Sequence, residues 1–327
     1  MKRKIAAIFS ILLAVLMIGS MTALAGDAGD EVFTVGICQL VQHNALDAAT
    51  QGFKDALVEK LGEDRVEFDE QNAAGDSATC ATITAGFAAS EVDLIMANAT
   101  PALQAAASAT STIPILGTSV TDYGSALTLS DFTGVVGGNI SGTSDLAPLD
   151  QQAEMVKELF PDAKTVGIMY CSGEANSVYQ AELVKGYLTD LGFEVNEYTF
   201  ADSNDVALVT QSACDECDVL YIPTDNTAAS CTSAIDAVAR PAQVPIVTGE
   251  ENMCLGCGVA TLSISYYDLG RATGEMAAKI LTGEENISEM PIEYAAQTDK
   301  KYNAEICEAL GLKIPEGYVA IEVPEAE

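Results

Sequence analysis

The stretch Val92-Asp93-Leu94-Ile95-Met96-Ala97-Asn98-Ala99-Thr100-Pro101 holds the pattern that decides the fold. Its apolar part, Val92–Ala97, is short, which is typical of a buried strand. Thr100 is predicted as the N-cap of the next helix and Pro101 as its first residue, where a missing N–H costs nothing. The free N–H groups of such a helix start point back at the strand end and can bind a carboxylate.

The same order of apolar strand, polar turn and helix start recurs at Cys171–Ser177 and at Pro223–Asn226. Other apolar runs predict strands, and periodic segments predict helices between them. The predicted strands are Phe33–Gln39, Val66–Phe68, Ile113–Gly117, one near Val135 and Val136, Thr165–Tyr170, Phe193–Tyr198, Val219–Ile222, Val244–Thr248, Val259–Ile264 and one near Pro291–Tyr294. The predicted helices are Ala45–Leu61, Ser77–Ser90, Pro101–Ala109, Pro148–Phe160, Ser177–Leu191, Val206–Ala213, Thr227–Ala239, Tyr267–Leu281 and Asn303–Leu310.

This alternation predicts an α/β fold made of right-handed βαβ units. Two runs of similar length, with a break near residues 140–148, indicate two doubly wound parallel-sheet lobes. Ligands of such sheets bind beyond the carboxyl ends of the strands. We therefore expect a ligand cleft between the lobes, and a hydrophobic content of 49% is enough for a core in each of them.

The N-terminus has the features of a signal peptide, which we place at residues 1–25. A basic segment, Lys2-Arg3-Lys4, precedes the apolar run Ile5–Ile18, and Ala23-Leu24-Ala25 is a small-residue cleavage site. The 14 residues of that run are short for a membrane span, so removal is favoured over a retained anchor. We expect an extracytoplasmic protein that is secreted, periplasmic or associated with the cell surface.

The chain is strongly acidic. Its formal net charge is −33, and removal of three basic residues with the signal peptide leaves 12 Lys and Arg against 48 Asp and Glu, or −36. Such a surface repels nucleic acid and anionic lipid and keeps an exported protein soluble. We expect a monomer that binds no nucleic acid and needs no cofactor.

Nine cysteines do not form a recognisable disulfide framework, and their odd number leaves at least one thiol free. Two pairs, Cys214/Cys217 and Cys254/Cys257, raise the possibility of a zinc site. The 36 residues between the pairs exceed zinc-ribbon spacing. Small buried side chains or local disulfides are the favoured interpretation, and no metal site is predicted.

Several motifs occur in the order found in one known family. They are Val35-Gly36-Ile37, His43-Asn44-Ala45-Leu46-Asp47, Asp93-Leu94-Ile95, Ala99-Thr100-Pro101-Ala102, Ile113-Pro114-Ile115, Val120-Thr121-Asp122, Gly173-Glu174-Ala175-Asn176-Ser177, Thr224-Asp225-Asn226 and Tyr266-Tyr267-Asp268-Leu269-Gly270. Over residues 33–322 the chain resembles the substrate-binding proteins of tryptophan/tyrosine-type ABC transporters. Glu-Ala-Asn-Ser and Thr-Asp-Asn are the most specific parts of the resemblance.

The resemblance implies a type I periplasmic-binding-protein fold whose lobes are joined by three crossover segments. The N-terminal lobe would comprise residues 33–146 plus 267–283, and the C-terminal lobe residues 147–265 plus 288–322. An amino acid, expected to be aromatic, would bind between the lobes and be delivered to ABC permease subunits. Two departures are the lack of a lipid-accepting Cys and the presence of Cys171 where the family has a small polar residue.

The α-carboxylate of an amino acid needs convergent donors, and no Arg or Lys lies near the proposed loops. Thr100 and the helix N–H groups behind it are candidates, joined by Thr118, Ser119 and Thr121 from the next strand end. The alternative for Thr100 is a plain N-cap. Tyr123, Tyr179 and Phe132 could stack on an aromatic ligand, although tyrosines in such positions are mostly packed.

The ammonium group needs a negatively charged acceptor, and Asp225 and Glu250 both follow strands of the second lobe. Asp225 is favoured, with helix capping as its alternative, whereas Glu250 could be one more surface acid. Three polar residues at helix starts are the other ligand-binding candidates in the second lobe. They are Asn176 and Ser177 at one helix start and Asn226 at another.

His43, the single histidine, begins the first helix at the cleft mouth, where it either contacts the ligand or has a structural role. The sequence holds no nucleophile with a base, no carboxylates at catalytic spacing and no phosphate-binding glycine loop. We therefore expect a binding protein and not an enzyme. The alternatives are a stand-alone ligand sensor or an exported enzyme on the same fold.

Overall fold

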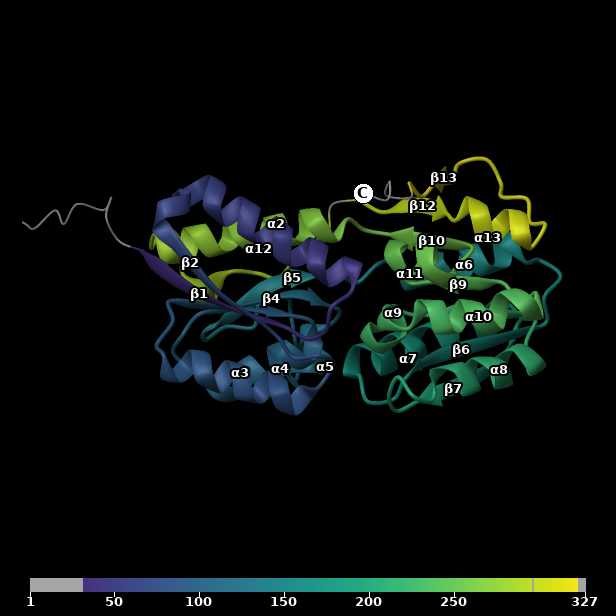
Figure 1. Ribbon diagram of the computed structural model, residues 1–327, viewed down its shortest axis with the longest axis horizontal. Helices are drawn as coiled ribbons and strands as arrows, with labels where there is room; N and C mark the ends of the chain where they lie inside the picture. The colour runs from purple at the N-terminus through teal and green to yellow at the C-terminus, as the bar shows by residue number, and fades with distance from the viewer. Residues whose placement is uncertain (1–31, 296, 323–327) are drawn as a thin grey trace, which may run out of the picture. The chain divides into compact units, whose positions relative to one another are not determined.

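The structure is a computed structural model that describes residues 32–295 and 297–322. From Phe33 onward the chain forms one compact unit that contains two mostly parallel β-sheets with helices on both faces (Figure 1). The predicted doubly wound α/β fold is therefore confirmed. The predicted signal peptide, residues 1–25, lies outside the described residues.

The first sheet has the strand order β11-β5-β4-β3-β1-β2, with all neighbours parallel. Its strands are β1 (Phe33–Gln39), β2 (Val66–Asn72), β3 (Leu94–Asn98), β4 (Ile115–Val120), β5 (Ile140–Ser144) and β11 (Glu293–Tyr294). Successive apolar residues of β3 serve opposite faces: Leu94 and Met96 pack into one core, and Ile95 into the other. Burial on both faces explains why these strands are continuous apolar runs.

Two helices, α2 (Asn44–Leu61) and α12 (Tyr266–Leu281), pack together on one face of this sheet, and α3 (Ser77–Ala89), α4 (Thr100–Ala109) and the short α5 (Tyr123–Ala126) cover the other (Figure 1). The crossing of α2 and α12 brings two backbones into contact. A Cβ on Gly270 would lie 2.0 Å from the carbonyl oxygen of Ala49, so only glycine fits there. This contact holds the start of α12 beside the first sheet.

The second sheet has the order β13-β12-β10-β9-β8-β6-β7. Its strands are β6 (Thr165–Cys171), β7 (Glu194–Phe200), β8 (Val219–Ile222), β9 (Ile246–Thr248), β10 (Ala260–Ser263), β12 (Asp299–Tyr302) and β13 (Val319–Ala320). All neighbours are parallel except β10 and β12, which pair antiparallel. This edge arrangement was not predicted.

Two apolar cores lie on the two faces of the second sheet. Helices α6 (Leu149–Leu159), α7 (Ala175–Asp190) and α13 (Ala304–Ala309) contribute to one core, whereas α8 (Val206–Glu216), α10 (Thr232–Ala242) and α11 (Glu251–Cys257) contribute to the other. The short helix α9 (Asn226–Ser230) begins directly beyond the end of β8. Single turns of 3-10 helix occur at Glu63–Arg65 and Ile287–Glu289.

Three sequence-based predictions about individual elements were wrong. The strand placed near Val135 and Val136 is β5, farther along the chain at Ile140–Ser144. The single helix predicted at Thr227–Ala239 is two helices, α9 and α10, separated at Cys231, whose φ of −119° and ψ of 15° are not helical. The N-cap of α4 is Ala99, so Thr100 is the first helical residue.

Three segments connect the sheets. The chain passes from β5 to α6 through residues 145–148, returns from β10 to α12 through residues 264–265, and passes from β11 to β12 in the last part. The pairing of β11 with β5 gives the segment 288–322 a strand in the first sheet as well as strands in the second. We call the parts built on the first and second sheets the first and second lobes.

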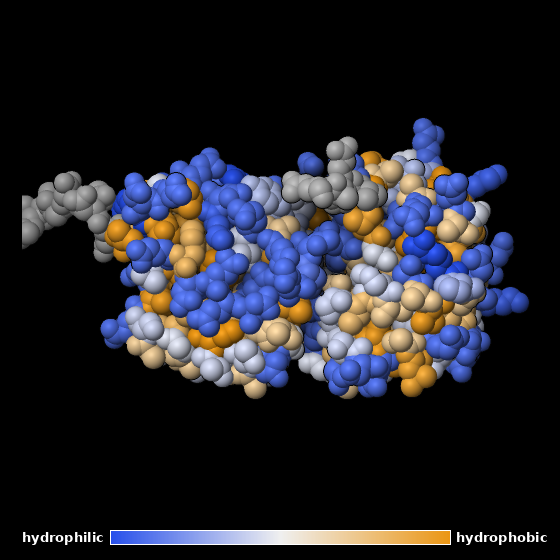
Figure 2. Space-filling view, viewed as in Figure 1, coloured by the Kyte–Doolittle hydropathy of each residue, from blue (hydrophilic) through white to orange (hydrophobic). Residues whose placement is uncertain are grey.

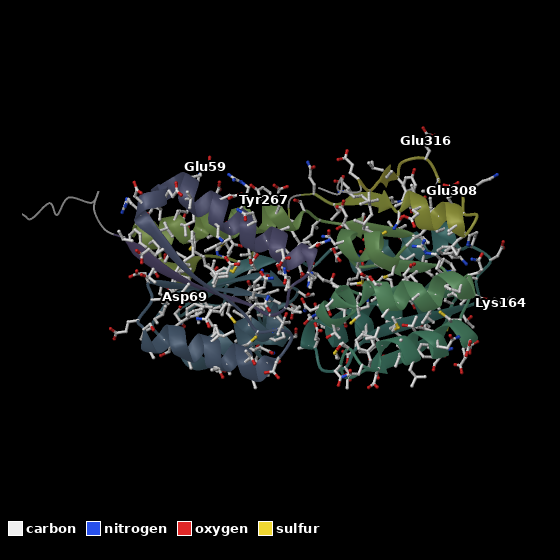
Figure 3. All side chains as sticks on the ribbon, viewed as in Figure 1. Glu59, Asp69, Lys164, Tyr267, Glu308 and Glu316 are labelled. Atoms are coloured by element: carbon white, nitrogen blue, oxygen red, sulfur yellow. The ribbon has the colours of Figure 1, made fainter. Side chains whose placement is uncertain are left out.

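The surface is polar and acidic. Hydrophilic residues dominate over α2 on the face shown in Figure 2, and Glu59, Glu308 and Glu316 extend outward in Figure 3. No helix within the described part of the chain is both long and apolar enough to cross a bilayer.

Candidate functional site

A small enclosed cavity lies at the carboxyl ends of the strands, between the two lobes. Its volume is about 10 Å³, which is near the space needed by one water molecule. Most of its polar lining consists of predicted site residues. The lining residues are His43, Ala45, Leu46, Ser119, Thr121, Asp145, Asn176, Thr224, Asp225, Asn226, Ala229, Glu250 and Tyr266. We call this space the central cavity.

Glu174 organises the second-lobe side of the cleft. One oxygen, Oε1, accepts hydrogen bonds from the backbone N–H and the hydroxyl of Thr227, at 2.9 and 2.7 Å. The other, Oε2, accepts from the backbone N–H and side-chain amide of Asn226, at 3.1 and 2.6 Å, and from the amide of Asn176. The carboxylate thus binds the N-terminus of α9, where the helix dipole favours negative charge. The sequence analysis did not single out this residue's role.

Asp225 is the N-cap of α9. Its Oδ1 accepts from the N–H of Ala228 at 2.7 Å, and its Oδ2 from the N–H of Cys171 at 2.6 Å. Burial, with a further contribution from Glu174, raises the pKa of Asp225 to about 7. The capping alternative for Asp225 is therefore present in the structure, alongside its position on the cavity wall.

Glu250 is the N-cap of α11, and its carboxylate accepts from the N–H groups of Asn252 and Met253. The side chain is buried, so it is not one more surface acid. Burial raises its pKa to about 7. Both second-lobe acids predicted from the sequence thus line the central cavity as buried helix caps.

Asp145 is a cavity residue that the sequence analysis missed. It lies in the first connecting segment, where Oδ1 accepts from the hydroxyl of Thr121 at 2.9 Å and Oδ2 from the hydroxyl of Tyr266 at 2.8 Å. Burial raises the pKa of this carboxyl as well. No sequence motif could have revealed it, because Tyr266 begins α12 directly after the second connecting segment, 121 residues away.

His43 and Asn226 meet across the two lobes. The Nε2 atom of His43 lies 3.5 Å from Oδ1 of Asn226, whose amide nitrogen is fixed by Glu174. Nε2 therefore donates, because an amide oxygen can only accept. Burial lowers the pKa of His43, so the ring is neutral and its Nδ1 is an acceptor. His43 precedes α2 but its side chain does not cap that helix.

Four of the predicted site residues carry a buried polar atom that has no hydrogen-bond partner. These atoms are Nδ1 of His43, Oγ1 of Thr100, Oγ of Ser119 and Oδ1 of Asn176. Buried polar atoms are normally paired, so each such exception needs an explanation. Three of the four residues line the central cavity, and they come from both lobes. A polar ligand in that cavity could bond to the atoms of these three residues.

Thr100 corrects a sequence-based prediction. Its side chain caps nothing, because the N-cap position belongs to Ala99 and Oγ1 is unpartnered. The backbone bends sharply here: Ala99 has a φ of +89° and Ser119, at the end of β4, a φ of +54°. Such strain in non-glycine residues is typical of functional sites. Thr100 itself does not line the central cavity, although it begins a helix at the cleft.

Of the remaining predicted residues, Thr121 lines the central cavity, and Thr118 and Ser177 do not. Thr118 is buried beside Thr143, with 3.2 Å between the two hydroxyl oxygens, and does not line the cavity. Thr121 lines it and donates to Asp145. Ser177 lies in the first turn of α7, where it accepts from Asn176 and bonds to Asp225. The structure therefore brings together seven of the ten predicted residues and places Thr100, Thr118 and Ser177 outside the lining.

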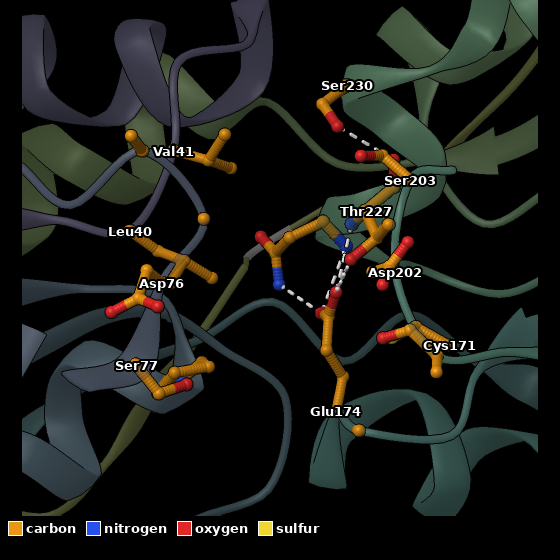
Figure 4. A pocket seen from close by; sticks show the side chains of 16 residues that line it. Leu40, Val41, Asp76, Ser77, Cys171, Glu174, Asp202, Ser203, Thr227 and Ser230 are labelled. Atoms are coloured by element: carbon orange, nitrogen blue, oxygen red, sulfur yellow. Dashed lines mark hydrogen bonds between the residues drawn. The ribbon is translucent and has the colours of Figure 1, made fainter. Parts of the chain in front are cut away.

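A larger cavity of about 410 Å³ lies next to the central one, with Asn226 lining both. Figure 4 shows Leu40, Val41, Asp76 and Ser77 of the first lobe on one side, and Cys171, Glu174, Asp202, Ser203, Thr227 and Ser230 of the second lobe on the other. Pro101 adds to the apolar first-lobe side. We call this space the outer cavity.

The three aromatic residues considered for stacking do not line either cavity. Tyr123 is packed in the first core, where its hydroxyl donates to the carbonyl of Thr143 at 3.1 Å. Tyr179 and Phe132 line a shallow depression elsewhere. The general expectation that such tyrosines are packed is thus correct for Tyr123.

All nine cysteines are free thiols, so the local disulfides considered above are absent. Cys254 and Cys257 are buried, and Cys257 packs in the second-lobe core between the sheet and α10. Within the described residues, no group of three or more His, Cys, Asp or Glu side chains is arranged to hold a metal ion.

Comparison with known proteins identifies the family. The model of the ABC transporter substrate binding protein family matches residues 34–322. The chain belongs to this family. Members of the family are binding proteins, and substrate-binding proteins of ABC transporters are extracytoplasmic or surface-associated.

Similar proteins support the same assignment for this substrate-binding protein. A tyrosine-binding protein of Clostridioides difficile strain R20291 is 36% identical over 281 residues, covering 85% of this chain and 81% of the relative. A structure of an ABC domain in complex with L-Trp from Streptococcus pneumonia is 32% identical, covers 88% of this chain and all of the other, and has a TM-score of 0.84.

A third relative is closer in sequence but less similar in structure. It is the ligand-free, open structure of a substrate-binding protein with adhesive properties from Clostridium difficile, 39% identical over 89% of this chain and 99% of its own, with a TM-score of 0.68. The fold of this substrate-binding protein is thus more similar to the L-Trp complex than to the open form.

Proposed function

We propose that this protein is the extracytoplasmic receptor of an ABC importer and binds an aromatic L-amino acid between its two lobes. The observation that carries the proposal is the convergence of unpartnered buried atoms of His43, Ser119 and Asn176 on one cavity. One relative is named as a tyrosine-binding protein, and another was solved in complex with L-Trp, which supports an aromatic ligand.

The first lobe would hold the carboxylate of the ligand. The hydroxyls of Thr100 and Ser119 are unpartnered, and the N-terminus of α4 has no side-chain cap. Free backbone N–H groups and neutral hydroxyls bind a carboxylate without a basic residue. The second lobe would hold the ammonium group with Asn176 and the carboxyls of Asp225 and Glu250.

The aromatic side chain would extend into the outer cavity. Its first-lobe side includes Leu40, Val41 and Pro101, which suit a ring, next to the polar Asp76 and Ser77. The second-lobe side has hydroxyls and carboxylates that suit a polar substituent.

Binding requires the lobes to move. The central cavity, at about 10 Å³, is too small for the charged ends of an amino acid. The lobes would therefore separate to admit the ligand and then close on it with a wider central cavity than in this arrangement. A ligand that contacts both lobes favours the closed form by the free energy of those contacts. The greater similarity to the L-Trp complex than to the open relative supports a closed arrangement.

Permease subunits would recognise the closed receptor, which we expect to act as a monomer and to make or break no bond. The signal peptide at residues 1–25 would direct export of the chain from the cytoplasm. Its lobes would comprise residues 33–146 with 267–283, and 147–265 with 288–322, apart from the strand β11 described above.

A thermal-shift panel of the twenty L-amino acids, followed by titration calorimetry, tests the proposal. L-tyrosine or L-tryptophan should raise the unfolding midpoint and bind with one ligand per chain. A panel in which no aromatic amino acid shifts the midpoint would refute the proposed function. Product formation during the incubation would favour the exported enzyme instead.

A matched pair of variants tests the site. Ser119→Ala removes an unpartnered buried hydroxyl on the cavity wall, and Thr261→Val removes one inside β10, away from both cavities. We expect Ser119→Ala to weaken ligand binding by about tenfold, because a hydrogen bond to a charged group is lost. Thr261→Val should leave affinity unchanged. Equal affinities in the two variants would remove Ser119 from the site.

A further inference from the structure

The central cavity has more hydrogen-bond acceptors than donors. Three carboxyl groups line it, those of Asp145, Asp225 and Glu250, and all three side chains are at least 96% buried. No Lys or Arg is among the described residues that line it. Buried carboxylates without a cation are costly, so this lining is complementary to a positively charged group.

The hydrogen bonds of the three carboxyls leave them able to accept more. Each oxygen of Asp145 accepts one bond from a protein donor, and the two oxygens of Asp225 accept from two backbone N–H groups and from Ser177. These bonds do not use all the lone pairs, because each carboxylate oxygen has two. The same holds for Glu250, whose oxygens accept from two backbone N–H groups. A donor on a bound ligand can therefore add to these bonds.

Two further atoms in the lining are acceptors that lack any donor. Oδ1 of Asn176 is unpartnered although the residue is only 3% exposed, and its amide nitrogen is already engaged by Glu174 and the carbonyl of Thr224. Nδ1 of His43 is also unpartnered, and it is an acceptor because the ring donates through Nε2. These atoms are independent of the acidic cluster and require the same thing, a donor.

We propose that the amine is the group on which recognition depends, so that the ligand class extends to primary arylalkylamines and excludes deaminated aryl acids. This rests on the proposed function and deepens it. A primary ammonium group brings a positive charge to a lining without a Lys or Arg, and three N–H donors to its acidic side chains and unpartnered acceptors.

The carboxylate of an amino acid is accepted but contributes less. Its donors are neutral hydroxyls and backbone N–H groups, and three acids stand close by, so part of the attraction is offset by repulsion. Removal of the carboxylate loses hydrogen bonds but relieves that repulsion. Removal of the amine leaves buried acids and unpartnered acceptors facing a second anion.

Calorimetric titration of three compounds with the same ring tests the proposal. They are L-tyrosine, tyramine, which lacks the carboxylate, and hydroxyphenylpropanoate, which lacks the amine. We expect tyramine to bind about 10- to 100-fold more weakly than L-tyrosine, and hydroxyphenylpropanoate at least about 1,000-fold more weakly.

The outcomes separate this inference from the proposed function. If L-tyrosine binds and hydroxyphenylpropanoate is bound as well as or better than tyramine, the amine proposal is overturned and the receptor stands. Binding of tyramine without any amino acid would support the amine proposal and overturn the proposed function. If none of the three compounds binds and the amino-acid panel is also silent, both are overturned.

A charge-neutral variant adds a second readout. Asp145→Asn keeps the shape of a cavity acid that caps no helix, and it should weaken tyramine and L-tyrosine by about tenfold while not weakening hydroxyphenylpropanoate. Asp122→Asn is the matched control, because Asp122 caps α5 outside the cavity and Asn is an equally good cap. If Asp145→Asn does not fold, the three-compound comparison on the unaltered protein decides alone. Loss of affinity for all three compounds alike would contradict the proposal.

Discussion

The two walls of the cleft use polar residues in opposite ways. On the first-lobe wall, Thr100 and Ser119 have unpartnered hydroxyls next to strained backbone. No side chain caps helix α4, which begins at Thr100. On the second-lobe wall, Glu174, Asp225 and Glu250 bind the starts of α9 and α11 with every carboxylate oxygen engaged. The first wall therefore has hydroxyls that no protein group uses, whereas the acids of the second wall are held by the backbone N–H groups that they accept from, although Oδ1 of Asn176 is unpartnered there as well.

This difference separates stability from affinity. A side chain without protein partners can be shortened at little cost to folding, whereas a carboxylate that satisfies several buried N–H groups cannot. The first-lobe wall should therefore yield variants that fold and bind poorly. The second-lobe wall should yield variants that fold poorly.

The largest effect is expected at Glu174. Glu174→Ala leaves the buried N–H groups of Asn226 and Thr227 without acceptors, which should lower the free energy of unfolding by about 3 kcal/mol. Urea unfolding of the ligand-free protein measures it. Glu182→Ala, at an exposed acid in helix α7, which begins directly after Glu174, is the control and should change stability by less than about 0.5 kcal/mol. Equal stabilities of the two variants would show that the second wall is not held by its acid.

A pH dependence should follow from the same wall. The pKa values of Asp225 and Glu250 are raised to about 7 by burial, so the folded state binds more protons than the unfolded state up to that pH. The stabilisation that these two carboxyls give the folded state is complete below the pKa values that they have in the unfolded chain. It is lost as pH rises through about 7, the pKa of both groups in the folded state. The lowered pKa of His43 acts in the opposite direction but involves one group. We expect a net loss of about 2 kcal/mol between about pH 5 and about pH 8.

Urea unfolding of the ligand-free protein at both ends of that range measures the loss. Glu250→Gln keeps a carbonyl oxygen for the cap and removes one titrating group, so its stability should vary less with pH. The stabilisation by an amine ligand should run the other way and grow above pH 7, because ionised carboxyls pair with ammonium. A ligand-free stability that rises steadily from acid to alkaline pH would contradict this account.

The smallest expected change in stability, with a clear change in affinity, is at Thr100. Thr100→Val is isosteric and removes a hydroxyl that no protein group uses, so the free energy of unfolding should stay within about 0.5 kcal/mol. Ligand affinity should fall by about tenfold, or about 1.5 kcal/mol. Calorimetry and urea unfolding on one preparation measure both. A stability loss without an affinity loss would make Thr100 a structural residue.

The apolar strands and capped helices could be predicted because their signals are local. β5 could not, because the buried residues of Ile140–Ser144 are small and polar and give no apolar run. Ser141 and Thr143 are buried there by hydrogen bonds to Met290 and Thr273, from segments far along the chain. Hydropathy cannot indicate a strand whose burial depends on such distant partners.

The roles of Thr100 and Asp225 could not be assigned for a related reason. Both follow a strand and precede a helix, so the sequence allows either residue to cap its helix. The choice depends on the backbone: Asp225 has an extended conformation and bonds to Ala228, whereas the φ of +89° at Ala99 moves the cap position one residue back. A shift of the N-cap position by one residue thus decides whether the hydroxyl of Thr100 caps the helix or has no hydrogen-bond partner.

The sequence by itself determined an α/β chain with polar residues at the ends of its strands, because the spacing of apolar residues and the chemistry of helix starts are local properties. Only the tertiary structure decided which of those polar atoms remain unpartnered and that Asp145 and Tyr266 join the cavity. A hydrogen bond is satisfied by whichever group arrives in space, and residues from distant segments meet only when the chain is folded.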